Sequence, residues 1–330
     1  STETILNSLP NANPPGSDNN SSLKIVRVNI RGTVTPDKQV GGVTVPGARI
    51  VSFKLAFDDG STTSTSDVMV RGIGPGLKGT EGGTNYAQDY TPLANPNLYV
   101  NRFADDLSGS SVFVTDNYDW STQRSENKAS SLIPTEAAKM SIPIDLNVLD
   151  AAAIYPFIYG FYTFPVQSDG VSSGVAWVGA DKIDLNDGSR FTHCSCRGDV
   201  GIGGDIMILS FEIVGDSSAT TKVLVRGRGP SLANLGVTSG YLNDASLEVF
   251  KFDSNWVAQP LDGQTSTNDN WTTNNDATID QIATSLDFNV GLADSDPAIL
   301  LQLGPGYYTA KLKGNNNTTG VGWVAVDEVP

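Results

Sequence analysis

Most of the recognisable motifs in this chain occur twice, in the same order, and this internal repeat limits what the chain can fold into. The two copies of each motif lie between 142 and 155 residues apart, a drift typical of loop insertions. The four pairs are 70–77 with 225–232, 117–120 with 268–271, 144–148 with 286–290, and 174–178 with 320–324. A repeat of this length predicts two copies of one domain. Each candidate site can therefore be compared with its own duplicate.

Length and charge narrow the class of protein. At 330 residues the chain has the length of two domains, and its 39% hydrophobic content is enough for two cores. No apolar run approaches the roughly 18 residues of a membrane span, so we expect no membrane insertion. With 21 Lys and Arg against 36 Asp and Glu, the net charge of −15 repels phosphate backbones. We therefore expect no nucleic-acid partner.

The two cysteines and the one histidine lie together in the segment 193–196. Cys194 and Cys196 are two apart on an expected strand, where they share a face but are poorly placed for a disulfide. A closed metal site needs about four ligands, more than this segment offers. In the first copy, Val28 and Ile30 occupy the matching positions. The two cysteines are therefore predicted to be buried core residues.

Short alternating segments separated by Gly, Asn, Asp and Pro predict an all-β fold. We expect two tandem antiparallel β-sandwich domains, Ig-like or jelly-roll-like, over 23–184 and 185–330, after an extended tail at 1–22. The expected strands of the first domain are 23–31, 48–57, 67–71, 97–103, 111–115, 159–166 and 173–180. Those of the second are 189–196, 206–213, 222–226, 246–253, 298–303, 307–312 and 320–327. Short helices are expected at 135–140 and 278–284.

Two segments have the outline of catalytic motifs. Residues 74–79 match the dinucleotide pattern GxGxxG, but no helix opens after them and the duplicate lacks the second glycine. Residues 170–174 match GxSxG, but a strand follows and the duplicate has no serine. The first segment is predicted to be a glycine-dependent turn and the second a hairpin turn. No nucleotide cofactor and no catalytic triad are expected, so the chain is not predicted to be an enzyme.

Acidic loops offer a hypothesis for Ca²⁺ binding. Its candidates are Asp116 and Asp119 in one copy, and Asp269, Asp294 and Asp296 in the other. Oxygen-rich loops can hold Ca²⁺, but no EF-hand pattern is present and the carboxylates shift between copies. Turn and capping roles account equally well for these residues and are favoured. Nothing in the sequence singles out two carboxylates as a glycosidase pair.

The tryptophans divide into a repeated set and a single exception. Trp177 and Trp323 occupy equivalent strand positions and are predicted to be core. Trp120 and Trp271 follow the polar loops and are expected to close a sandwich end rather than to stack on sugar. Trp256 has no counterpart and lies among Ser, Asn and Gln. It is the candidate for an exposed aromatic contact with a glycan.

The tail at 1–22 is rich in Pro, Asn and Ser and carries a small apolar group, Ile5, Leu6 and Leu9. Ser1 is interpreted as the residue left by removal of a signal peptide, which implies a secreted, extracellular or cell-surface location. A tail of this kind can add a strand to a neighbour's sheet. Thr2 to Leu9 would supply that strand, and the last strand, 320–327 with Val324 and Val326, is the expected accepting edge.

The second copy resembles a known repeat. The residues that carry the resemblance are Arg-Gly-Asp-Val-Gly-Ile-Gly-Gly-Asp at 197–205, the strand and turn at 225–232, Asn-Asp-Asn-Trp at 268–271, 303–310 and 319–321. This order is similar to a β-sandwich repeat of large secreted or surface-anchored bacterial proteins. The first copy matches more loosely, with Gly76 where the second has Ser231. The resemblance implies an extracellular, non-enzymatic role and supplies no catalytic residues.

Together these observations predict a secreted structural subunit whose partners are copies of itself. The expected assembly is a filament, a sheath or a surface layer, because a two-fold repeat suits head-to-tail stacking. The alternative is a carbohydrate-binding or adhesive module that uses Trp256 or the pair Trp120 and Trp271. A polysaccharide-degrading enzyme is a third hypothesis. A cofactor is not expected, apart from the Ca²⁺ hypothesis.

Overall fold

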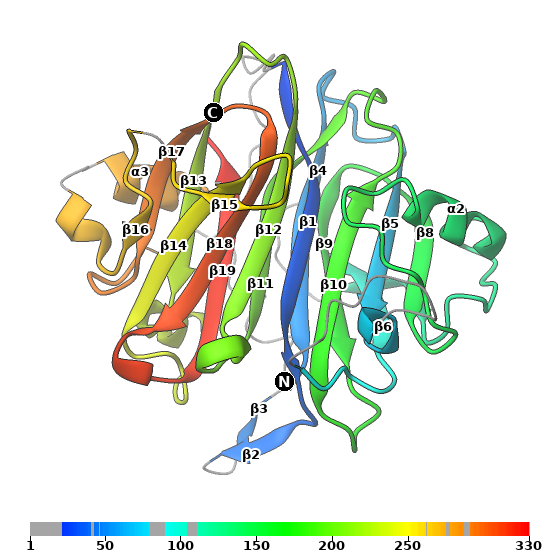
Figure 1. Cartoon of the computed structure of the whole chain (residues 1–330), viewed down its shortest axis with the longest axis horizontal. Helices are drawn as coiled ribbons and strands as arrows, with labels where there is room; N and C mark the ends of the chain where they lie inside the picture. The colour runs from blue at the N-terminus through cyan, green and yellow to red at the C-terminus, as the bar shows by residue number, and fades with distance from the viewer. Residues whose placement is uncertain are drawn as a thin grey trace.

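The strands of the computed structural model form two antiparallel layers (Figure 1). The structure describes residues 22–40, 43–45, 47–78, 90–103, 111–261, 263–274, 278–286 and 291–329. Within these ranges 17 strands form one hydrogen-bonded network, in which a single pairing, Ile25 with Phe191, links two extended sheets. The rings of Phe53 and Phe157, one from each sheet, lie 5.2 Å apart in the space between them. The fold is therefore an all-β sandwich, as predicted.

Each sheet draws strands from both halves of the chain. The first sheet runs in the order β8 (Ala151–Phe157), β5 (Ser66–Ile73), β10 (Gly174–Lys182), β1 (Leu23–Val34), β12 (Met207–Gly215), β18 (Gly306–Gly314) and β14 (Ala245–Phe252), with the short β15 (Ala258–Gln259) and β16 (Thr267–Asn268) beyond β14. The second runs in the order β17 (Ala298–Leu303), β13 (Thr221–Arg228), β19 (Gly320–Glu328), β11 (Ser189–Val200), β4 (Arg49–Phe57), β9 (Gly160–Gln167), β6 (Asn97–Arg102) and β7 (Val112–Asn117).

The strand pairings of the first half return in the second. Strand β1 pairs with β10 of its own half and with β12 of the other. In the same way β11 pairs with β19 of its own half and with β4 of the other. The junction between the halves is thus built twice, reciprocally, once in each sheet. An internal duplication and a boundary after residue 184 stay predictions, although the matching pairings are what a duplication would produce.

Alternation along the strands determines which side chains enter the sandwich. In β1, Val28 and Ile30 face the core, whereas Asn29 and Arg31 lie on the outer face. One hydrophobic core runs through both halves, with Cys194 and Cys196 among its buried members. Both cysteines are free thiols, and burial raises the pKa of each. The prediction that they are core residues is confirmed.

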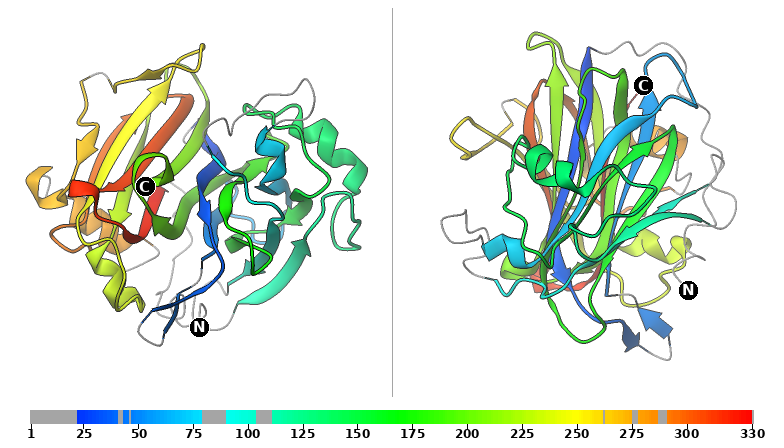
Figure 2. Two further views of the ribbon diagram at one scale, coloured as in Figure 1. Left: turned by 60° about the horizontal axis from the view of Figure 1, so that its bottom comes forward. Right: turned by 90° about the vertical axis from the view of Figure 1, so that its right-hand side faces the viewer.

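Helices are short and lie outside the layers. Helix α2 (Ile133–Ala137) lies at one end of the molecule and α3 (Thr278–Ser285) at the other, while the hairpin of β2 (Lys38–Val40) and β3 (Val43–Val45) projects beyond β1 (Figures 1 and 2). The 3-10 segments are η1 (Pro75–Lys78), η2 (Ser130–Leu132), η3 (Gly203–Asp205), η4 (Pro230–Leu235), η5 (Trp271–Asn274) and η6 (Asn315–Asn317). Among the described helices, none has the length and apolar character to cross a membrane.

Every strand predicted from the sequence overlaps an observed one, but one prediction about their arrangement is wrong. The last strand, β19, was expected to be an open edge that accepts the tail. It lies inside the second sheet, paired with β11 on one side and β13 on the other, and Val324 and Val326 are fully buried. The end of a chain need not be the edge of a sheet, because strand order in space differs from strand order in sequence.

Candidate functional site

The repeated Arg-Gly-x-Gly-Pro motif begins with a buried arginine that serves the fold. In β13 the guanidinium of Arg226 donates two hydrogen bonds, of 2.9 and 2.6 Å, to Asp327 Oδ2 on the neighbouring β19. It also lies 5.2 Å from the centre of the Trp323 ring. In the first half Arg71 donates to Asp181 Oδ2 over 2.8 Å. The same ion pair holds corresponding strands in both halves, so the motif is structural at this position.

The glycines of the motif form a turn that is tied to a buried carboxylate. Asp150 accepts hydrogen bonds from the backbone N–H groups of Gly74, Gly76 and Asn147, the shortest being 2.7 Å from Asn147. Burial raises the pKa of Asp150 to about 6, against the opposing effect of these three donors. This network ties the Gly-x-Gly-Pro turn after β5 to the residue before β8. The prediction of a turn at 74–79 is confirmed for 74–78, and Gly79 lies outside the described residues.

One of the predicted Ca²⁺ ligands belongs to the matching turn of the second half. Asp296 is fully buried and accepts hydrogen bonds of 2.9 Å each from the backbone N–H groups of Gly229 and Ala293. It therefore takes the place that Asp150 has in the first half. Its carboxylate oxygens are occupied by backbone donors, an arrangement that serves to fix a turn.

The other Ca²⁺ candidates do not converge. Asp116 forms an ion pair of 2.5 Å with Arg124, and Asp119 caps its own turn. Asp269 and Asp294 are exposed. Across the described ranges no three His, Cys, Asp or Glu side chains are grouped so that they could hold a metal ion.

A hydrogen-bonded chain of Asp327, His193 and Ser195 has the connectivity of a catalytic triad. His193 Nδ1 is 2.6 Å from Asp327 Oδ1, and His193 Nε2 is 2.9 Å from Ser195 Oγ. Burial raises the pKa of Asp327, but the nearby charges of Arg226 and His193 outweigh burial and hold that pKa below its usual value. Sequence reasoning missed this chain because Asp327 is far from the other two in sequence and reaches them only through the pairing of β19 with β11.

The position of this chain argues against catalysis. Both His193 and Ser195 are 1% exposed, so a substrate carbonyl has no path to the serine oxygen. The imidazole lies between the rings of Phe161, at 5.5 Å, and Trp323, at 6.2 Å. A nucleophile must be reachable by substrate as well as by its base. We interpret the chain as a satisfied polar network beneath an aromatic cluster.

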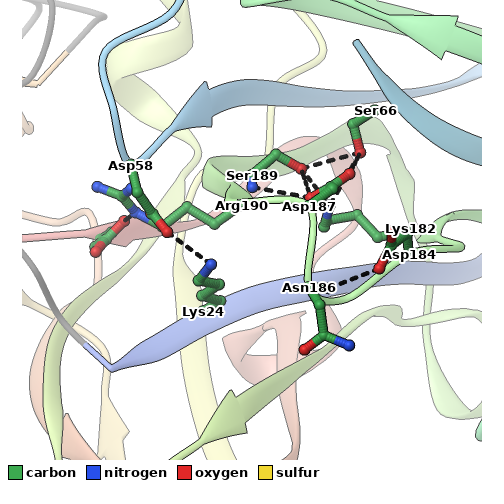
Figure 3. A network of polar contacts seen from close by, with 10 residues as sticks. Lys24, Asp58, Ser66, Lys182, Asp184, Asn186, Asp187, Ser189 and Arg190 are labelled. Carbon is green, nitrogen blue, oxygen red and sulfur yellow. Dashed lines mark hydrogen bonds and ion pairs between the residues drawn. The ribbon is translucent and has the colours of Figure 1, made fainter. Parts of the chain in front are cut away.

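A second buried network surrounds Lys182 at the junction of the halves (Figure 3). The ammonium group contacts Ser66 Oγ at 2.9 Å, Asp187 Oδ1 at 2.7 Å and the hydroxyl of Ser189. An ammonium has three protons to donate, and three acceptors surround this one. Burial lowers the pKa of Lys182, with Asp187 opposing the effect. The lysine and two serines resemble a Ser-Lys catalytic centre, but all three are buried and hydrogen-bonded to one another. Their role is structural, because they bind the segment that connects the two halves to the start of β5.

An open cavity lies elsewhere, on the outer face of the first sheet where the two halves meet. Its volume is about 680 Å³, within the usual range for sites that bind small molecules. Strands β1, β10, β12, β14 and β18 contribute to its floor, and the segment 141–144, Leu77 and Trp256 form parts of its wall. The described lining residues include the aromatic side chains of Trp177, Phe250, Phe252, Trp256 and Tyr307. This cavity is the strongest candidate for a ligand-binding site.

Sequence reasoning identified one of its residues. Trp256, the predicted glycan contact, lines the cavity and is 48% exposed. Phe252 and Tyr307 were missed, because their proximity depends on the pairing of β14 with β18. Trp120 and Trp271 do not line the cavity. Trp120 packs against a buried cluster between helix α2 and the sheet, and Trp271 packs against the matching cluster beside α3. Of the predicted assembly residues, Val324 and Val326 are buried, and Thr2, Ile5, Leu6 and Leu9 lie outside the described residues.

Comparison with known proteins identifies no family for this chain. No family model matches it, and no curated protein matches it. The similarity to the repeat of bacterial surface proteins therefore stays a resemblance.

Proposed function

We propose that this chain is a secreted structural subunit that assembles with copies of itself into an extracellular filament, sheath or surface layer. The observation that carries the proposal is the outer edge of β7. Among the described strands β7 pairs only with β6, and two of its apolar side chains are exposed, Val112 by 67% and Phe113 by 56%. An apolar edge strand of this kind accepts strands from other chains.

At other sheet edges, residues that do not belong to a strand make hydrogen bonds to the backbone of the edge strand. Along β17, the side chain of Gln264 accepts from Gln302 N at 2.8 Å and donates to Gln302 O at 3.0 Å, as a neighbouring strand would. Along β8, Lys128 N donates to Ile154 O at 2.8 Å. Natural sheet proteins protect their edges in this way. The contrast favours the Val112–Phe113 end of β7 as the edge used in assembly, because at the other end Thr115 is bonded to Glu126 and Asn117 to Ala152 N of β8.

The segment before β1 has the composition of a donor strand. Ile5, Leu6 and Leu9 supply apolar side chains, and Pro10 cannot continue a hydrogen-bonded ladder. Main-chain hydrogen bonds to β7 would provide affinity, and the apolar side chains would cover Val112 and Phe113. The resemblance to repeats of surface proteins supports the extracellular location. Because the partner is another copy, repetition of the contact produces an open polymer.

The test compares assembly of the full chain, a variant lacking residues 1–21, and Val112→Lys. Negative-stain electron microscopy and sedimentation should show polymers for the full chain and single particles for both variants, since a lysine at a sheet edge opposes pairing. Val171→Lys is the matched control, because Val171 is 86% exposed in a turn away from β7. Polymers that persist without residues 1–21 would rule out the tail as donor. Polymers that persist in Val112→Lys would rule out β7 as acceptor.

A further inference from the structure

The exposed indole of Trp256 is held in place at the cavity by aromatic contacts. Its ring centroid lies 5.1 Å from that of Tyr307 and 5.8 Å from that of Phe252. Both partners belong to adjacent strands of the sheet, so they form a rigid support. About half of the tryptophan surface nevertheless stays open to solvent. Exposed aromatic surface over a concave site is a typical feature of ligand contacts.

The backbone at Trp256 is held in an unfavourable conformation to present this side chain. Its φ of 59° lies in the left-handed region, which bulky residues rarely adopt. The carboxylate of Asp253 accepts hydrogen bonds from Asn255 N and Val257 N at 2.8 and 2.9 Å, and the backbone N–H of Trp256 donates to Asp253 O at 3.0 Å. Strain of this kind persists only where the surroundings impose it, and it is concentrated at functional sites.

The charged side chains at the cavity are all basic. Arg31 and Lys311 line it, and the described lining contains no carboxylate, although acidic residues outnumber basic ones 36 to 21 in the chain. Lys311 also forms an ion pair of 3.8 Å with Glu248, whose carboxylate lies outside that lining. The guanidinium of Arg31 lies over the ring of Tyr90, at 4.8 Å, which leaves its edge available for hydrogen bonds. A local reversal of the overall charge favours an anionic ligand.

Hydroxyl groups complete the floor between the aromatic and the basic residues. Ser210 and Thr309 lie side by side on β12 and β18, with their oxygens 2.8 Å apart, and Ser141 contributes a third hydroxyl from the wall. Such groups exchange hydrogen bonds with hydroxyl-bearing ligands.

We propose that this cavity binds a saccharide that carries a carboxylate, such as a uronic acid unit of an acidic polysaccharide. The apolar face of the sugar ring packs against Trp256 and Tyr307. Its carboxylate is bound by Arg31 and Lys311, as charge-assisted hydrogen bonds favour. Its hydroxyls meet the half-buried hydroxyl of Ser210, which Thr309 orients from the neighbouring strand. The inference is independent of assembly through β7, which belongs to the other sheet, although it would let an assembled layer bind an acidic glycan.

The test is calorimetric titration of the full chain with a galacturonic acid trisaccharide and with the matched neutral galactose trisaccharide. We expect the acidic sugar to bind at least tenfold more tightly than the neutral one. Trp256→Ala should weaken acidic-sugar binding at least tenfold, while Trp256→Phe retains most of it. Arg31→Gln and Lys311→Gln should each reduce the preference for the carboxylate, whereas Lys222→Gln, an exposed residue of β13, should not.

Several results would overturn the proposal. Equal affinity for the two sugars would remove the role of the basic pair, and binding unaffected by Trp256→Ala would place the site elsewhere. Binding of a fatty acid in the cavity with no binding of either sugar would assign it to an apolar ligand. Thermal unfolding of each variant checks that the fold is retained. Assembly measured on Trp256→Ala separates this proposal from the previous one, since that variant should still polymerise.

Discussion

Arg49 and Arg71 are both fully buried arginines, but their surroundings differ. Arg71 is paired with Asp181 and lies 4.4 Å from the ring centre of Trp177. None of the three guanidinium nitrogens of Arg49 has a hydrogen-bond partner within the described structure, and burial lowers its pKa. Strand β12 pairs with β1 in the same way as β4 pairs with β11. In these matching registers the buried Met207 of β12 takes the position that Arg49 has in β4. One half of the molecule thus buries a methionine where the other buries a charge.

We predict that Arg49→Met stabilises the protein. A buried charge without hydrogen bonds carries a desolvation cost, and replacement of buried ionic groups by apolar residues of similar volume stabilises by about 1–4 kcal/mol. Arg71→Met should have the opposite effect, a loss of about 3–5 kcal/mol, because it leaves Asp181 buried without its partner. Denaturant unfolding measures both free energies. If Arg49→Met is as destabilising as Arg71→Met, the guanidinium of Arg49 stabilises the folded protein and is not an uncompensated buried charge.

At the scale of elements, individual strands were predictable from sequence, but their neighbours were not. Period-two alternation located β1, β4 and the other long strands. The alternation pattern did not predict β8, because its first residues, Ala151, Ala152 and Ala153, have low strand propensity. It did predict β17, the strand at the matching position in the second half. The edge position of β7, the internal position of β19 and the cavity all depend on which strands pair across the two halves. A local pattern carries no information about such long-range pairing.

The turn after β5 gives a pH-dependent prediction, because Asp150 connects it to the start of β8. Its pKa is raised from 3.8 to about 6 in the folded protein, so the folded state binds more protons than the unfolded state between these pH values. The contribution of Asp150 to the free energy of unfolding is therefore complete below about pH 3.8 and declines as pH rises through 6. The change amounts to about 3 kcal/mol at most.

Comparison with Asp150→Asn isolates this effect. The difference in unfolding free energy between the natural protein and the variant should fall steadily from pH 4 to pH 7. Asp169→Asn supplies a control of opposite sign. Hydrogen bonds from Ser172 and Val171 lower the pKa of the exposed Asp169, so its contribution is lost as pH falls. A difference for Asp150→Asn that is flat or rises with pH would show that its carboxylate is ionised throughout.

At the scale of the whole molecule, the halves share their sheets instead of meeting as separate sandwiches. Both junctions, β1 with β12 and β11 with β4, are antiparallel ladders of eight residue pairs, each with one register shift, between Ile25 and Arg27 and between Phe191 and His193. One salt bridge crosses the junction at one end, between Asp58 and Arg190 at 2.7 Å (Figure 3). Each partner also contacts a residue of its own half, Asp58 with Lys24 at 2.7 Å and Arg190 with Glu328 at 2.8 Å. Separate domains usually meet through smaller, more polar surfaces. The two halves should therefore behave as one cooperative unit.

We predict a single unfolding transition for the whole chain and no stable fold for either half alone. Separation at residue 184 would expose β1 and β4 on one fragment and β11 and β12 on the other, each with unpaired backbone groups and adjacent apolar side chains. Calorimetry of the full chain should give one peak with equal calorimetric and van't Hoff enthalpies. The fragments 22–184 and 185–330 should aggregate or form dimers when produced alone, and should form a one-to-one complex when produced together. Two resolved transitions, or monomeric folded fragments, would instead establish two independent domains, and the shared ladders would then contribute little to the stability of either half.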